Sequence, residues 1–81
     1  MSSYLAEFSN RHPSTQEKLR WLIPNPKLPE GTPSIVAAQL GDAGIELARR
    51  VKDGPQLTIA LQRLIDAKDA AVRQAIADSD S

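Results

Sequence analysis

The fold is decided by residues 32–77, whose sequence is TPSIVAAQLGDAGIELARRVKDGPQLTIALQRLIDAKDAAVRQAIA. Thr32-Pro33 is typical of a helix start, because threonine can cap a helix and proline suits its first position. Gly54-Pro55 predicts the end of this helix and the start of another. So short a link makes consecutive helices lie antiparallel. We therefore predict a long antiparallel helical hairpin over residues 34–77.

Both halves of the predicted hairpin carry apolar residues at helical spacing, which indicates amphipathic helices. In the first helix these residues are Val36, Leu40, Ala43, Leu47 and Val51. In the second they are Leu57, Leu61, Leu64, Ala71 and Ala75, widened by Ile65, Val72 and Ile76.

A second stripe on the first hairpin helix consists of small residues, Ala37, Gly41, Gly44 and Ala48. A glycine inside a helix costs about 1 kcal/mol relative to alanine, so two of them need a compensating reason. Small residues allow another backbone or a ligand to come close. The stripe is explained by tight packing inside the hairpin, by a subunit interface, or by direct approach of a ligand.

The part before the hairpin is rich in proline, since five of the six prolines lie in residues 13–33. We expect a first short helix capped by Ser2 or Ser3 and ended by Pro13. A second is expected to start at the capping box Ser14–Glu17 and to end at Pro24. An extended connector then leads to Gly31. We predict one all-α domain over residues 1–81, with residues 1–33 packed on the hairpin and residues 78–81 as a polar tail.

Length and composition restrict the function. A domain of 81 residues without cysteine has a marginal core, so we expect a homo-oligomer. One histidine and no cysteine exclude a conventional zinc cluster, and we expect neither metal nor cofactor. A net charge of +0 argues against a surface for duplex nucleic acid. There is no long apolar run and no signal-peptide pattern, so we expect a cytoplasmic protein without a membrane segment.

Two cations on the second hairpin helix are candidate anion ligands. Lys68 interrupts the apolar stripe, and a buried ammonium must snorkel, pair with an acid, or meet an anion such as phosphate. Arg73 projects about 140° away from Lys68 on the same helix. The two could act on one ligand if a second chain completed the pocket.

The N-terminal part combines aromatic and basic side chains in one short stretch. Cations beside aromatic rings could stack a base and neutralise a phosphate, or the aromatic rings could simply cover the open face of the hairpin. His12 could also be a surface or capping residue. The candidate ligand-binding residues here are Tyr4, Phe8, Arg11, His12, Arg20 and Trp21. We find no cysteine nucleophile, glycine-rich phosphate loop or nucleophile elbow, so we expect a binding protein and not an enzyme.

Residues 54–76 resemble the second helix of small phage proteins of the anti-CBASS/anti-Thoeris helical-hairpin family. That helix has the form ALxxLxEAxxxAVRA, represented here by Ala60-Leu61, Leu64, Ala67 and Ala71-Val72-Arg73. The stretch 8–16, with Phe8, His12-Pro13 and Gln16, resembles the opening of some members. The chain departs from the family in its longer proline-rich segment over residues 22–33.

The resemblance implies a sponge, a helical oligomer that traps a cyclic oligonucleotide or cyclic ADP-ribose-type signal between protomers in the infected bacterial cell and does not cleave it. Arg73 is the one position that the family motif carries over as functional. Two alternatives remain open: a helical adaptor or inhibitor that acts on a protein partner through Trp21 and the connector, and a small DNA-binding regulator.

Overall fold

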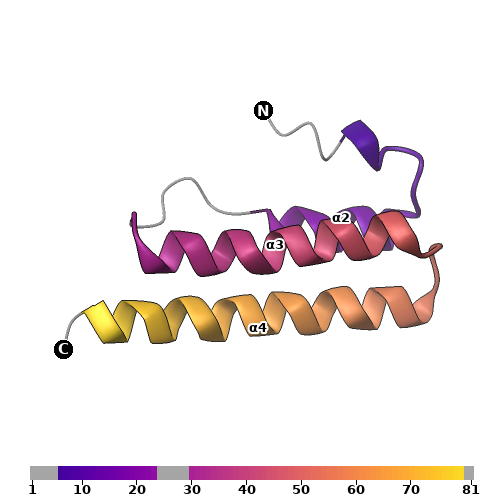
Figure 1. The fold of residues 1–81 in the computed structure, drawn as a ribbon. Coiled ribbons are helices and arrows are strands. Elements are labelled where there is room, and N and C mark those ends of the chain that lie inside the picture. Colours follow the sequence, from indigo (N-terminus) through magenta and orange to yellow (C-terminus); the bar gives the residue numbers. More distant parts are fainter. Residues whose placement is uncertain (1–5, 24–29, 80–81) are drawn as a thin grey trace.

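The computed structural model describes residues 6–23 and 30–79, and this part of the chain is all-helical with no β-strand. Figure 1 shows its helices α2 (Pro13–Leu22), α3 (Thr32–Arg50) and α4 (Pro55–Ser79). The predicted all-α class is therefore confirmed. The start of the predicted first helix, including Tyr4, and connector residues 24–29 lie outside the described residues; residues 6–7 are helical and a turn follows at 8–10.

The start of α2 differs from the prediction. The helix begins at Pro13, and His12 is its N-cap, with the His12 Nδ1 accepting a hydrogen bond from the Ser14 backbone N–H at 3.1 Å. The predicted capping box at Ser14–Glu17 is therefore wrong. Proline at the first helical position loses nothing by lacking an N–H, because that group has no partner inside the helix. Pro13 thus begins α2 and does not end the helix before it.

The bounds of α3 and α4 lie close to those expected. The N-cap of α3 is Gly31, whose φ of 101° is one that glycine adopts without steric cost, so the cap lies one residue before the predicted Thr32. At its other end α4 continues through Ser79, two residues beyond the predicted end. A hydrogen bond of 2.7 Å from Gln74 to the Asp78 carboxylate lies in this last part of the helix.

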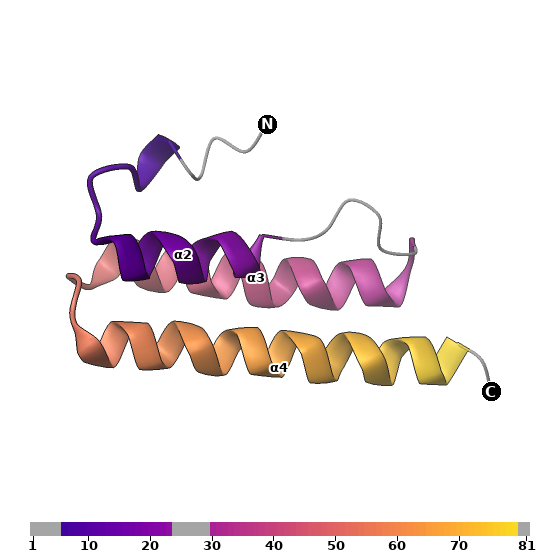
Figure 2. The ribbon, with the colours of Figure 1, turned by 180° about the vertical axis from the view of Figure 1, so that it is seen from behind.

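The three helices form two layers. α3 and α4 lie side by side and run in opposite directions, while α2 lies behind α3 in Figure 1 and in front of it in the reversed view of Figure 2. Contacts from the start and the middle of α2 show its direction relative to α4. The Ser14 and Thr58 hydroxyls lie 3.4 Å apart, and the Lys18 ammonium donates to Gln62 at 2.6 Å. α2 is therefore parallel to α4 and covers only one face of the α3–α4 layer.

The core lies where α2 meets that layer. The inner face of α2 contributes a fully buried polar residue, Thr15. Leu47, Leu64 and Ile65 pack against the core from its edge. Its buried side chains are those of Phe8, Leu19, Leu22, Ile45, Ala48, Leu57 and Leu61.

The buried face of α3 is not the expected stripe of large aliphatic residues. A Cβ on Gly44 would lie 2.5 Å from the Leu22 Cδ1, too close for a real contact, so glycine lets the Leu22 side chain of α2 lie against α3; the 3.6 Å to the Leu64 Cδ1 of α4 is an ordinary contact distance. Tight packing inside the chain therefore explains the small residue at Gly44. The stripe Val36, Leu40, Ala43, Leu47 and Val51 is half-buried or exposed. The buried residues of α3 are Pro33, Ala37, Gly41, Gly44, Ile45 and Ala48.

None of α2, α3 and α4 combines the length and the apolar character that a membrane crossing requires.

Candidate functional site

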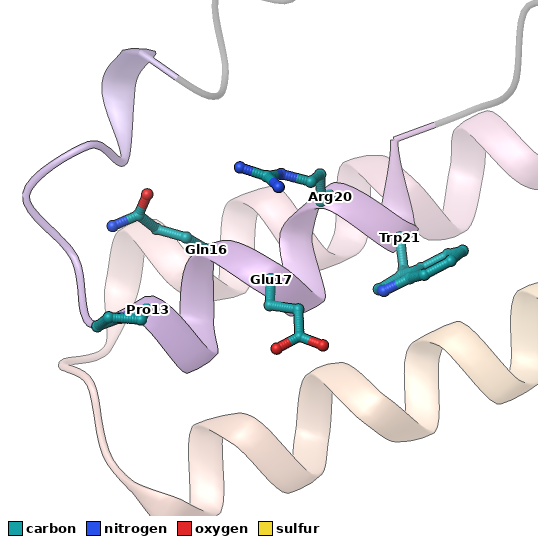
Figure 3. A pocket seen from close by; sticks show the side chains of 5 residues that line it. All are labelled: Pro13, Gln16, Glu17, Arg20 and Trp21. Atoms are coloured by element: carbon teal, nitrogen blue, oxygen red, sulfur yellow. The ribbon is translucent and has the colours of Figure 1, made fainter.

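The outer face of α2 is the first candidate binding surface. Five of its side chains line a hollow of about 690 Å³, opposite the inner face that joins the core (Figure 3). They recur at alternating spacings of three and one, so they follow one side of a helix. These residues are Pro13, Gln16, Glu17, Arg20 and Trp21, of which Arg20 and Trp21 are predicted site residues.

Trp21 presents most of its indole on this face, with 63% of the residue exposed. Its position in the helix accounts for this. Leu19 and Leu22 point into the core, and position 21 lies about 200° around the helix from position 19. The alternative in which Trp21 covers the open face of the hairpin is therefore wrong. The single tryptophan of the chain is available to a ligand or a partner.

Arg20 is exposed beside Trp21. Within residues 6–23 and 30–79 its guanidinium has no hydrogen-bond or ion-pair partner. Figure 3 shows Arg20 and Trp21 extending in opposite directions along α2. The face therefore offers a cation and an aromatic ring that are separated from each other.

Arg11 is occupied in holding the chain together. Its guanidinium donates to the backbone oxygens of Ala48 and Val51 at the end of α3, the latter at 2.9 Å. These carbonyls lie in the last turn of α3 and just after it, where a helix has unsatisfied acceptors and favours a cation. The same guanidinium lies 5.8 Å from the centre of the Phe8 ring. Arg11 thus caps α3 from the segment that precedes α2.

Asp53, in the turn between α3 and α4, receives donors from the start of α2. It accepts from the Arg11 Nε, from the His12 backbone N–H and from the Thr15 hydroxyl, each at 2.8 Å. The His12 N–H, then the Thr15 hydroxyl and the Arg11 guanidinium, hold the pKa of Asp53 below its usual value. We call Arg11, His12, Thr15 and Asp53 the Asp53 latch. Sequence reasoning missed Asp53.

We expect the latch to make the free energy of unfolding depend on pH in the acidic range. The pKa of Asp53 is lower in the folded protein than in the unfolded chain. Its contribution to the free energy of unfolding is therefore complete above the unfolded pKa of about 4 and is lost as the pH falls through the folded pKa. The pKa of Glu7 is also lowered, by its hydrogen bond with the Arg49 guanidinium, so Glu7 adds to the same pH dependence. Urea unfolding between about pH 5 and pH 2 should show the free energy of unfolding falling with pH.

Asp53→Asn should reduce that slope, because an amide presents one acceptor oxygen and cannot titrate. Asp42→Asn is the matched control, since Asp42 is exposed and belongs to no ion pair among the described residues. Equal slopes for wild type and Asp53→Asn would contradict the assignment of the latch.

Lys68 of α4 lies at the C-terminal end of α2. Its ammonium donates to the backbone oxygen of Trp21, one of the last carbonyls of α2. Burial lowers the pKa of Lys68, while the nearby carboxylate of Asp69 raises it. A cation at the C-terminus of a helix satisfies an orphan acceptor and complements the helix dipole. The partner of Lys68 in the structure, a backbone carbonyl, is not among those that the sequence predicted, which were an acid and an anion.

The remaining predicted residues do not form one site with these. Phe8 is 3% exposed and belongs to the core. Arg73 is exposed on α4 and, within the described residues, has no hydrogen-bond or ion-pair partner. Lys68 is half-buried beside α2, so the two cations of α4 lie on different sides of the helix. The structure therefore separates the described candidates into five environments: the Asp53 latch (Arg11, His12), the outer face of α2 (Arg20, Trp21), the core (Phe8), the C-terminal end of α2 (Lys68) and the exposed side of α4 (Arg73).

A smaller polar hollow of about 280 Å³ lies at the latch, lined by His12, Ser14, Asp53, Gly54, Pro55 and Thr58. The Ser14 hydroxyl lies 2.9 Å from the His12 Nδ1, but the same nitrogen caps α2. Within the described part of the chain no acid contacts the imidazole, so the pair lacks the orienting group of an activated serine. No group of three potential metal ligands gathers among the described residues either.

Comparison with known proteins gives no match to a family model, to a curated protein or to a solved structure.

Proposed function

We propose that this protein binds and sequesters a cyclic nucleotide signal, as a homo-oligomer, without cleaving it. The proposal follows the resemblance of residues 54–76 to phage immune-evasion sponges, in which such a protein would act in the cytoplasm of an infected bacterium. The outer face of α2 is the binding surface we propose. The alternative is an adaptor or inhibitor that uses the same face on a protein partner.

The observation that carries the proposal is the exposed Trp21 ring and, on the same hollowed face, the Arg20 guanidinium, which has no hydrogen-bond or ion-pair partner among residues 6–23 and 30–79. An indole stacks on a nucleobase whatever the base, and a guanidinium matches the geometry of a phosphate. The two side chains diverge along α2, which suits a ligand whose bases and phosphates are separated by ribose (Figure 3). The Gln16 side-chain oxygen and the Glu17 carboxylate provide acceptors for the edge of a base, while the Gln16 Nε2 donates to the backbone oxygens of Ser9 and Arg11.

Binding requires little rearrangement of this surface. The inner face of α2 is fixed by buried Leu19 and Leu22, and the ammonium of Lys68 holds its last turn through the Trp21 backbone. A rigid helix with two free functional side chains is pre-organised, which lowers the entropy cost of binding. Exposed Arg73 remains a second proposed phosphate ligand, supported by the family motif.

The test is a thermal-shift and calorimetric screen of the full chain against cyclic di- and trinucleotides and cyclic ADP-ribose isomers, with linear nucleotides as controls. A ligand at about 100 times its dissociation constant adds about 2.7 kcal/mol to the stability, a clear shift for so small a domain. The ligand should be recovered chemically intact after the protein is denatured. Recovery of a cleaved ligand would contradict sequestration.

Variants separate the proposed contacts. Trp21→Ala and Arg20→Ala should each weaken binding by about tenfold or more, the loss of one stacked base or one charged contact. Arg73→Ala tests the position that the resemblance implies, and Arg63→Ala, also exposed on α4, is its matched control. Unchanged affinity in both Trp21→Ala and Arg20→Ala would remove the site from the outer face of α2.

One observation favours the protein-partner alternative. Tryptophan and arginine are among the residue types most enriched among the side chains that dominate protein interfaces, and here both are exposed on the outer face of α2. A partner retained by wild type and lost by Trp21→Ala in affinity purification, together with no shift in the nucleotide screen, would establish this function instead.

A further inference from the structure

The face of the α3–α4 layer opposite α2 is covered by no described helix. Figure 1 looks onto this face, and Figure 2 shows α2 on the other side of the layer. On α4, Thr58, Gln62 and Lys68 point towards α2 and form hydrogen bonds with it. The positions of α4 about a third of a turn away from these therefore point to the uncovered side.

Helical spacing directs two apolar stripes towards this uncovered face, and their members Leu47 and Leu64 also pack against the edge of the core. On α3 they are the aliphatic residues at spacings of four, three and four, Val36, Leu40, Ala43 and Leu47. On α4 the same spacings give Ala60, Leu64, Ala67 and Ala71. The pattern is that of the a and d positions of packed helices. Neither stripe contains a charged residue, although a quarter of the chain is charged.

The face is also hollowed at its turn end. An almost wholly apolar hollow of about 350 Å³ lies between Leu47 and Val51 on one side and Leu57 and Ala60 on the other. Ala43 and Ala67 are exposed, and Val51 remains 43% exposed. Large residues on α3 lie beside small residues on α4, so the surface can receive a layer with the same alternation.

We propose that a second copy of this chain packs on this face, so that two α3–α4 layers form a four-helix bundle with α2 on each outer side. A two-fold axis parallel to the helices would relate the two copies. In this arrangement α3 of each copy lies over α4 of the other, and large residues meet small ones. The proposal rests on the homo-oligomer of the proposed function, but not on its ligand. Both outer faces of α2 remain free.

The area of the uncovered face and the net charge of the chain are compatible with a second copy as its partner. α3 has 19 residues and is about 28 Å long, and two adjacent helices present a face about 20 Å wide. Two such faces bury about 1,100 Å² in total, above the roughly 1,000 Å² that a specific interface needs. The formal net charge of the chain is +0, so two copies meet without long-range repulsion.

The test is sedimentation velocity and native mass spectrometry of the full chain over a range of concentrations. We expect a dimer or an even-numbered assembly in the wild type. Ala43→Glu and Ala67→Glu place carboxylates on residues that are exposed in one chain but buried between two, so each should raise the dimer dissociation constant by about tenfold or more. Circular dichroism should show unchanged helix content.

Ile35→Glu is the matched control, because Ile35 is 58% exposed on another side of α3 and should leave the assembly unchanged. Trp21→Ala should also remain assembled, so loss of ligand binding and loss of the interface can be told apart. A monomeric wild type, which would leave the face to a different partner, would overturn the proposal. So would an assembly that Ala43→Glu and Ala67→Glu do not weaken.

Discussion

Gly44→Leu is expected to lower the free energy of unfolding by about 3 kcal/mol, a large share of the stability of so small a domain. A single Cβ at this position would already lie 2.5 Å from the Leu22 Cδ1 and 3.6 Å from the Leu64 Cδ1. A leucine must therefore push α2 and α4 away from α3. Urea unfolding followed by far-ultraviolet circular dichroism measures the change.

Gly54→Ala is the control for this prediction. No atom lies within 4 Å of the place where its Cβ would be, and among the described glycines the positive φ belongs to Gly31, not to Gly54. This variant should match the wild type or be slightly more stable, since alanine restricts the unfolded chain. A loss below about 1 kcal/mol for Gly44→Leu would show that the helices are not packed as closely as described.

Leu22→Ala is expected to lower the free energy of unfolding by about 3 kcal/mol as well. Leu22 is 0% exposed and occupies the space that Gly44 leaves open, so its truncation removes buried apolar surface and leaves a cavity. Ile35→Ala, at a position 58% exposed, removes a similar side chain from the surface and should change stability by about 0.5 kcal/mol or less.

The two changes should be coupled when they are combined. In Leu22→Ala/Gly44→Leu the new leucine can enter the space that the old one vacated, so the double variant should be less destabilised than the sum of the single variants. Simple additivity would mean that Leu22 and Gly44 do not touch in solution.

The sequence predicted the all-α class and the bounds of α3 and α4 closely, because prolines and apolar spacing act locally, but it placed the cap of α2 at Ser14 instead of His12. It did not predict which face of α3 is buried. Val36, Leu40 and Leu47 are the larger apolar residues and were assigned the apolar face, yet the Leu22 side chain of α2 lies against α3 at Gly44, and the buried face consists largely of glycine and alanine. The two glycines inside the helix were the signal for this close approach, and the sequence left three explanations of them open.

The candidate site was predicted in part. Features set by neighbouring residues could be found from the sequence, whereas contacts between residues far apart in the chain could not. Trp21 follows Leu19 by two residues, so its exposure could have been read from helical spacing once Leu19 and Leu22 were placed in the core. Asp53 could not be found in this way. Its donors come from Arg11, His12 and Thr15, about 40 positions earlier in the chain, and an aspartate before Gly-Pro is otherwise an ordinary turn residue.

The Asp53 latch also has a consequence for the order in which the chain folds. α3 and α4 are joined by a turn of four residues, so their contacts form early, at small cost in loop closure. The Arg11–Asp53 and Lys18–Gln62 contacts span 42 and 44 positions and bring α2 onto a layer that must already exist. We therefore expect α2 to dock last and to undock first, so that its amide hydrogens exchange with solvent before those at the centres of α3 and α4.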